Sequence, residues 1–394
     1  MIEAVENPVV LEASTRVRFA IASLRDDASI RRLLRDNPMK GAISLAFERE
    51  PDYFRGDGLA GAQDRTIVAY ENDRLVCMGK TSVRRRFVNG RACAVGYLGE
   101  LRLDVSVQGR FDILRRGYRY FRELVDSNEV GAPVLWCTSI ASDNQRSLRF
   151  LERNLPGMPS YGFVGEFVTV LVAVPLRPSV AERRAADARD SLRGDGYRLE
   201  SGSVERLSAM AQLLNQQGAT GQFGSEWTPD LLESLARHGL PVEDWVCVSE
   251  TSDLVACAAL WDQRGFRQTV IRGYGGAIAA GRRFFNLLAA VLGRPKLPSV
   301  DMVLPHAFLS PIGFKPGCGL SLTKLVDLCL PVARRRGLDF LTMGFAATDP
   351  ILPDLRRHFH CREYRSRLYR VSWPNGNGSV VLDDRSPSPE VALL

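Results

Sequence analysis

The sequence predicts an α/β (α+β) fold made of two tandem domains, each with a mixed, largely antiparallel sheet flanked by helices. Three observations support this prediction. The chain has 394 residues, which is too long for one ordinary hydrophobic core. Apolar, β-favouring runs alternate with runs whose apolar residues recur at three- and four-residue spacing, as in helices. The order of these runs in residues 16–174 starts again in residues 197–373, with little residue identity between the two.

The first half, residues 14–175, follows a loose arm at residues 1–13. Asp26 and Asp27 suit the first turn of a helix, where acidic groups interact favourably with the helix dipole. Asn89-Gly90 lies between two extended runs, and both residues can take the positive φ of a tight hairpin turn. The expected elements are strands at 16–21, 66–70, 75–87, 94–103, 133–140 and 161–174, and helices at 26–34, 42–49, 111–124 and 145–153.

The second half, residues 197–373, follows a charged, Ala- and Arg-rich segment at residues 176–196 that is expected to be a partly helical linker. Thr228-Pro229 begins a helix, because proline is favoured in the first turn. The tail, residues 374–394, is rich in Gly, Ser, Pro and Asp and is expected to be disordered. The expected elements are strands at 197–200, 245–250, 254–261, 267–274, 302–314, 339–345 and 364–373, and helices at 204–216, from 228, at 277–292, 320–336 and 350–358.

The composition indicates a soluble globular protein, with 45% hydrophobic and 25% charged residues. The chain has no run of about eighteen apolar residues, and its N-terminus lacks the pattern of a signal peptide. We therefore expect a cytoplasmic protein with no membrane partner. The eight cysteines form no C-x-x-C pair, which favours buried free thiols. His358-Phe359-His360-Cys361 lacks a second ligand cluster, so no metal site is expected.

The net charge of +7 comes almost entirely from arginine, a bias that is also typical of GC-rich bacterial genomes. The arginines lie in short scattered groups, such as residues 84–86, 115–116 and 334–336, and not in one basic tail. This distribution favours an anionic ligand and argues against nucleic acid as a partner.

Residues 95–123 form the segment from which a function can be argued. A strand ends at Leu103, a short polar loop follows, and an amphipathic helix begins near Phe111. A helix that opens directly from a strand-end loop presents free backbone N–H groups and the positive end of its dipole. Such a helix end is a ready site for phosphate, which suggests the diphosphate of a coenzyme.

The element order of residues 16–174 and the loop before this helix resemble the GNAT acetyltransferase superfamily. The loop pattern of that family is Gln or Arg, two residues, Gly, one residue, then Gly or Ala. The corresponding residues here are Gln108, Gly109, Arg110, Phe111, Asp112 and Ile113. Gln108 matches the pattern, whereas Phe111 and Ile113 replace small residues that let backbone N–H groups approach phosphates.

A second motif of the family follows the next strand. Asn144 and Ser147 match it, and Leu151 stands where the family often has a tyrosine that protonates the departing thiolate. Residues 197–373 resemble the family in element order alone, and the candidate phosphate loop there, residues 315–319, is weak.

The resemblance implies that an amine attacks the thioester of acetyl-CoA or of a longer acyl-CoA. The acceptor would be an amine on a small molecule or a peptide. Glu100, on the strand before the loop, is the candidate general base. The implied coenzyme contacts are Leu103, Val105, Gln108, Gly109, Arg110, Phe111, Asp112, Ile113 and Asn144.

Two other functions fit the same sequence. Fem-type aminoacyl or peptidyl transferases also pair GNAT-like halves, and the positive net charge permits charged tRNA as the donor. A degenerate, non-catalytic pair that binds an acyl ligand or a partner protein is favoured by the lost loop glycines and by Leu151. Single residues also have structural interpretations: Glu100 as a solvated strand residue, and Asp112 and Asn144 as helix caps.

Overall fold

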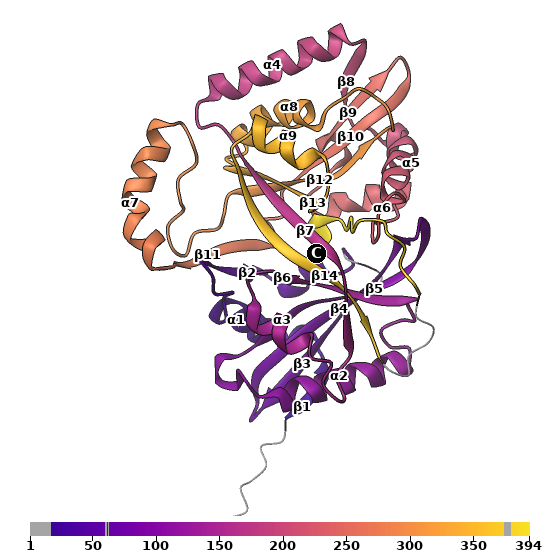
Figure 1. Cartoon of the computed structure of the whole chain (residues 1–394), viewed down its shortest axis with the longest axis vertical. Helices are drawn as coiled ribbons and strands as arrows, with labels where there is room; N and C mark the ends of the chain where they lie inside the picture. The colour runs from indigo at the N-terminus through magenta and orange to yellow at the C-terminus, as the bar shows by residue number, and fades with distance from the viewer. Residues whose placement is uncertain (1–16, 60, 62, 374–379) are drawn as a thin grey trace, which may run out of the picture.

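The computed structural model describes residues 17–59, 61, 63–373 and 380–394 (Figure 1). The predicted arm at residues 1–13 and residues 374–379 of the tail lie outside this part of the chain. In Figure 1 the described chain forms two lobes, and strands β7 and β14 run from one lobe into the other.

One sheet of 12 strands runs through both lobes. In spatial order its strands are β1 (Arg18–Ile21), β3 (Arg65–Glu71), β4 (Arg74–Val88), β5 (Arg91–Leu103), β6 (Leu135–Ala141), β14 (Cys361–Ser372), β7 (Ser160–Ala173), β13 (Phe340–Ala346), β12 (His306–Phe314), β10 (Asp253–Trp261), β9 (Trp245–Glu250) and β8 (Tyr197–Ser201). The pairs β5–β6 and β12–β13 are parallel, and the other neighbours are antiparallel. The predicted mixed, largely antiparallel sheet is thus confirmed.

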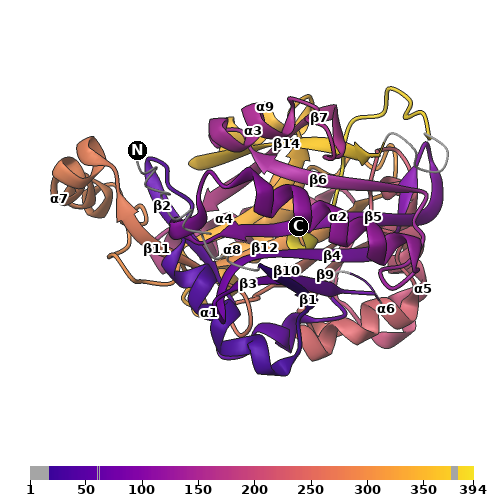
Figure 2. The same ribbon diagram turned by 90° about the horizontal axis from the view of Figure 1, so that it is seen from below.

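Helices flank the sheet in both lobes (Figures 1 and 2). They are α1 (Asp27–Asp36), α2 (Phe111–Asp126), α3 (Gln145–Leu151), α4 (Pro178–Gly194), α5 (Leu207–Gly218), α6 (Pro229–Ser234), α7 (Gly276–Val291), α8 (Leu322–Arg335) and α9 (Ile351–His358). The segment expected as a partly helical linker is largely α4, whose buried face includes Ala181, Ala185 and Leu192. In the described part of the chain, none of these helices has the length and apolar content needed to cross a bilayer.

The last strands of the two halves are exchanged. β14 lies between β6 and β7, and β7 pairs on its other edge with β13 of the second half. The largest core cluster accordingly contains Val170 and Val172 of β7 together with Leu325 of α8. The two halves therefore share backbone hydrogen bonds and one core, and they cannot separate without breaking both.

Residues 42–49 are not the helix that the sequence predicts. They contain strand β2 (Ile43–Glu48), which pairs antiparallel with β11 (Gln268–Tyr274) in a separate two-stranded ribbon. Ile43 and Phe47 are β-favouring residues, and the partner strand lies more than 200 residues away in the sequence. Pairing at that distance overrides the local pattern.

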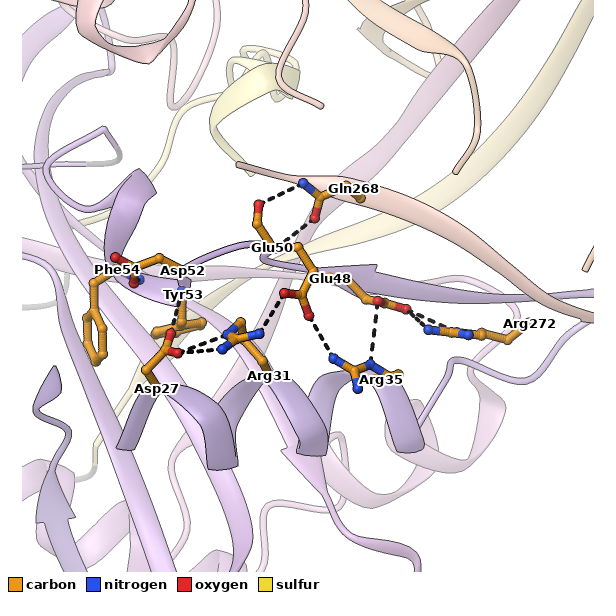
Figure 3. Close-up of polar contacts among 10 residues, drawn as sticks. All are labelled: Asp27, Arg31, Arg35, Glu48, Glu50, Asp52, Tyr53, Phe54, Gln268 and Arg272. Atoms are coloured by element: carbon orange, nitrogen blue, oxygen red, sulfur yellow. Dashed lines mark hydrogen bonds and ion pairs between the residues drawn. The ribbon is translucent and has the colours of Figure 1, made fainter. Parts of the chain in front are cut away.

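An ion-pair network joins this ribbon to α1 (Figure 3). Arg31 of α1 contacts Glu50 at 2.6 Å and Asp27 at 2.8 Å, and Arg35 contacts Glu50 at 2.7 Å. Arg272 of β11 pairs with the buried carboxylate of Glu48. The network connects a helix of the first half to a strand of the second.

The described end of the tail is ordered, so the predicted disorder is wrong for residues 380–394. Val391, Ala392 and Leu393 are buried, and the backbone N–H of Ser388 donates to the carbonyl of Gln222 at 2.7 Å. The Gly- and Ser-rich start of the tail dominates its composition, whereas the apolar run Val391–Leu394 supplies a side-chain set that can be buried.

Candidate functional site

A β-bulge in β5 places Glu100. Lys80 of β4 lies opposite Gly99, and Met78 lies opposite Arg102, so Glu100 and Leu101 together face the single residue between them on β4. Glu100 has a φ of 53°, which is uncommon for a residue with a side chain. Bulges of this kind redirect a side chain, and the carboxylate of Glu100 meets Arg49 and Tyr53.

Just before the bulge, β5 and β6 separate. Their parallel pairing runs from Val95 opposite Leu135 to Leu98 opposite Thr138, and β5 then continues to Leu103. Residues on both sides of the opening, 98–102 and 138–141, line one cavity. We call this opening the β5–β6 gap. It exposes strand backbone groups that an extended ligand with amide groups could pair.

The cavity has a volume of about 480 Å³ and is lined by both halves of the chain. One part is apolar and lies between α2 and the first-half strands. Its lining includes Phe19, Ile67, Met78, Ile113, Leu114 and Phe121. The other part is polar and includes Arg49, Lys80, Glu100, Arg267, His306 and Thr342.

The electrostatics around Glu100 keep it ionised. Burial by itself raises the pKa of Glu100, but the charges of Arg49, Lys80 and Arg267 more than offset this effect and lower the pKa to about 2. The Tyr53 hydroxyl donates to the same carboxylate at 3.1 Å, and its own pKa is raised by burial, so it stays protonated. Glu100 is therefore a strong anchor for a cation and, while Arg49 holds it, a weak base.

Two polar residues of the second half complete the cavity. The partly buried Arg267 guanidinium, whose pKa is lowered by desolvation to about 10, donates to the main-chain oxygens of Ala392 at 2.9 Å and Leu394 at 2.8 Å. His306 lies within hydrogen-bond distance of Thr342, at 3.0 Å. Burial lowers the pKa of His306 to about 4, which keeps the imidazole neutral at ordinary pH.

Three of the residues predicted from the sequence line the cavity: Glu100, Ile113 and Asn144. The side chain of Asn144 accepts from the backbone N–H of Ser147 at 3.2 Å, so it also caps α3. Glu100 is partly buried and ion-paired, which rules out a solvated strand residue. A side-chain hydrogen bond from Arg110 lowers the pKa of Asp112, and the backbone N–H groups of Asp112 and Ile113 lower it further. This is expected of a residue in the first turn of a helix.

The remaining predicted contacts lie on the strand end and loop that lead into α2. The loop holds its own charges: Arg110 pairs with Glu71 at 2.6 Å and with Asp112 at 3.0 Å. The exposed ring of Phe111 stacks on Phe150 with centroids 4.6 Å apart.

The other loop residues are also engaged. The backbone N–H of Val105 donates to Asn37 at 2.9 Å, and Gln108 accepts from Arg146 at 3.4 Å. Gly109 has a φ of 97°, which favours glycine. Leu103 is the last residue of β5. A diphosphate at this end of α2 would compete with Asp112, so the loop fits the coenzyme less well than the β5–β6 gap does.

The second half has a similar strand separation, filled by the chain itself. β12 and β13 pair only from His306 to Phe308. Beyond that point Ser310 of β12 hydrogen-bonds the carboxylate of Glu390. A Cβ on Gly344 of β13 would lie 2.6 Å from the Cβ of Val391. Residues 390–394 thus occupy the second gap and leave the first as the open one.

Sequence reasoning missed Arg49, Tyr53, Arg267 and His306. The Gly- and Asp-rich segment around residue 53 reads as a loop of the kind that lines binding sites. Nothing in the local sequence marks Arg267 or His306, because they reach the cavity through the packing of the second half. Among the described residues, histidine, cysteine and carboxylate side chains form no cluster of three or more that could hold a metal ion.

No protein-family model and no curated protein sequence matches the chain. Solved structures do match. Saccharomyces cerevisiae N-myristoyltransferase with bound myristoyl-CoA is 10% identical, with a TM-score of 0.55 over 95% of this chain and 88% of that one. The chain has a tandem GNAT fold. A GCN5-related glucosamine N-acetyltransferase region in a fungal GH3 β-N-acetylglucosaminidase is 11% identical, with a TM-score of 0.54 over 91% of this chain and 38% of that one. The GNAT resemblance drawn from Gln108 and Asn144 is thus confirmed for the fold.

Proposed function

We propose that the protein is an acyl-CoA-dependent N-acyltransferase whose donor enters through the β5–β6 gap. The observation that carries the proposal is that this gap opens directly into the cavity, past the Glu100 carboxylate. The first half, residues 14–175, would hold the coenzyme, and the second, residues 197–373, would complete the acceptor end with Arg267 and His306. The S. cerevisiae structure with myristoyl-CoA supports this class of donor.

The coenzyme would bind along β5. Between Leu101 and Leu103 the strand pairs with β4 on one edge and has no strand partner on the β6 side, where its backbone can exchange hydrogen bonds with the two amides of a pantetheine arm. Asn144 lies across the gap at the start of α3. At the diphosphate end, Gln108–Ile113 would contact the coenzyme. The positive charge there would come from the exposed Arg115 and Arg146, because Arg110 is already paired.

The acyl group is proposed to be longer than acetyl. The apolar part of the cavity is lined by large side chains such as Ile67, Leu114 and Phe121, and an acetyl group would leave most of it empty. Each methylene buried there contributes about 0.8 kcal/mol, or about fourfold in affinity. Acetyl-CoA is the reference donor against which the longer acyl-CoAs are compared.

In the proposed reaction the acceptor nitrogen forms a bond to the thioester carbon, and the carbon–sulfur bond breaks. The ammonium proton of the acceptor must first be removed, and coenzyme A leaves as a thiolate that takes up a proton. Glu100 is proposed as the base. An incoming ammonium group would compete with Arg49 for its carboxylate, and without that ion pair the effect of burial raises the pKa of Glu100.

The experiment is a binding series with free CoA, acetyl-CoA and acyl-CoAs of increasing chain length, measured by calorimetry. Affinity is expected to rise about fourfold per methylene until the cavity is full. Gly117→Leu, which places a side chain in the cavity wall, should abolish the rise and leave free CoA binding unchanged. Arg119→Leu, exposed on the same helix, is the matched control. Flat affinity across the series would contradict a long acyl group, and no binding of any CoA would contradict the whole proposal.

A non-catalytic acyl-CoA-binding protein is the second candidate. It is favoured by the loop around Asp112, whose charges pair with one another, and by the ion pair that Arg49 already makes with the Glu100 carboxylate. Chain-length-dependent binding without transfer to any amine, under conditions where the acyl-CoA is saturating, would select it. For transfer from charged tRNA, the supporting observation is the positive net charge of the chain.

A further inference from the structure

Helix α7 stands away from the body of the protein in both views (Figures 1 and 2). It is nevertheless fixed at both ends. The backbone N–H of Gly275 donates to the carbonyl of Ala42 at 2.9 Å, and the Tyr274 hydroxyl donates to the carbonyl of Pro298 at 2.7 Å. The side chain of Asn286 donates to the carbonyl of Leu297 and accepts from its N–H. The inner face of α7 is therefore held by polar contacts.

The outer face of α7 is apolar and exposed, the reverse of an ordinary surface helix. Phe284, Leu287, Leu288 and Val291 recur at three- and four-residue spacing on one face. Their exposed fractions are 73%, 65%, 47% and 69%, respectively. Ala289, on the opposite face, is 4% exposed. Large side chains in one exposed row mark an interaction surface.

The segment that carries this face has charges of one sign. Residues 275–300 contain Arg282, Arg283, Arg294 and Lys296 and no acidic residue. Arg283, Arg294 and Lys296 are exposed. The next acidic residue, Asp301, is paired with Arg272 at 2.6 Å. An apolar helix face with a basic rim is the composition of a helix that lies in the interface of an anionic membrane.

We propose that α7 docks the protein on an anionic phospholipid surface, with Phe284, Leu287, Leu288 and Val291 inserted among the lipids and the basic side chains at the headgroups. A second copy of the chain fits this face less well, because it would bring the same positive charges together. The expectation of no membrane partner is based on the lack of a spanning segment and of a signal peptide. A helix that docks on the membrane surface needs neither.

The position of α7 links docking to the cavity. β11 leads from Thr269, in the cavity wall, out to α7, and the returning chain reaches the wall again at Leu304. If the proposed acyltransferase function holds, docking would bring the cavity close to a surface where long-chain acyl donors and lipid-borne amines concentrate. The docking proposal itself does not depend on that function.

The test is sedimentation of the full chain with vesicles of phosphatidylcholine alone and with vesicles that contain about one third phosphatidylglycerol. Binding to the anionic vesicles is expected, weakening as salt is added. Phe284→Ser with Leu287→Ser should weaken it at least about tenfold for each side chain. Arg283→Gln, Arg294→Gln and Lys296→Gln should each weaken it about fivefold.

The controls are matched in chemistry and placed elsewhere. Val204→Ser removes an apolar side chain that is 57% exposed, and Arg183→Gln, Arg193→Gln and Arg198→Gln remove exposed charges near the other end of the second half. These variants should bind the vesicles like the unaltered protein, and all variants should keep its melting temperature. Equal binding to both kinds of vesicle, no binding, or equal loss in the controls would overturn the proposal. So would a dimer in lipid-free solution that Phe284→Ser with Leu287→Ser converts to a monomer. Acyl-CoA affinity should not change in any variant, which separates this result from the proposed function.

Discussion

Replacing Arg49 by glutamine removes the guanidinium that holds the Glu100 carboxylate ionised. The Arg49 side chain is 10% exposed and that of Glu100 is 19% exposed, so water screens the pair only weakly. In the folded protein the pKa of Glu100 is lowered from 4.5 to about 2, which corresponds to about 3 kcal/mol of stability. Arg49 acts on this pKa both through its charge and through its hydrogen bond.

The sign of the effect follows from linkage. A carboxyl group whose pKa is lowered by folding stabilises the protein above its unfolded pKa, and the contribution is lost as the pH falls from 4.5 through about 2. In Arg49→Gln the pKa of Glu100 should rise, because burial remains and the largest opposing charge is gone. The free energy of unfolding at neutral pH should fall by up to about 3 kcal/mol.

The assay is urea denaturation at neutral and acidic pH for Arg49→Gln, Glu100→Gln and the double variant. The double variant should lose much less than the sum of the two single variants, because removing both partners leaves no unpaired buried charge. Arg35→Gln is the control: its pair with Glu50 in the network of Figure 3 is 44% exposed on the arginine side, and its loss should cost at most about 1 kcal/mol. Additive losses within about 0.5 kcal/mol would refute the coupling of Arg49 to Glu100.

Two further predictions concern the second half. In Gly344→Ala the new Cβ would clash with the buried Phe167 ring and with Val391, at an overpacking cost of about 1–3 kcal/mol, and residues 380–394 should become exposed to proteolysis. Gly194→Ala, where a Cβ would meet nothing within 4 Å, should be neutral or slightly stabilising. Unchanged proteolysis together with an unchanged melting temperature of Gly344→Ala would contradict the close packing of Val391 in the second gap. His306, with its pKa lowered from 6.5 to about 4, should make stability fall by about 1.4 kcal/mol per pH unit as the pH drops between those values, because only the unfolded chain takes up the proton there. His306→Gln should remove this slope, and a slope that persists would assign it to another group.

Sequence reasoning located the elements whose signals are local. The strand β5, the loop after Leu103 and the helix α2 could be predicted because their apolar spacing and the Asn89-Gly90 turn are contained within a few residues. β2 could not be assigned, because its partner β11 lies far along the chain. The exchange of β7 and β14 could not be predicted either, because a β-favouring run does not specify which strands lie beside it.

The candidate site shows the same limit. Glu100 could be proposed from its place on the strand before the loop and Asn144 from the resemblance to the second GNAT motif, and both line the cavity. The ion pair that sets the charge state of Glu100 comes from Arg49, outside any motif, and depends on a bulge with positive φ. Arg267 and residues 390–394 reach the same cavity only through the packing of the two halves.

The most direct measurement is a crystal structure with a non-hydrolysable thioether analogue of a long-chain acyl-CoA. The pantetheine arm should lie in the β5–β6 gap, hydrogen-bonded to the backbone between Leu101 and Leu103, with the acyl chain against Ile67, Leu114 and Phe121. A ligand bound elsewhere, or a gap that stays closed to the saturating analogue, would contradict the account.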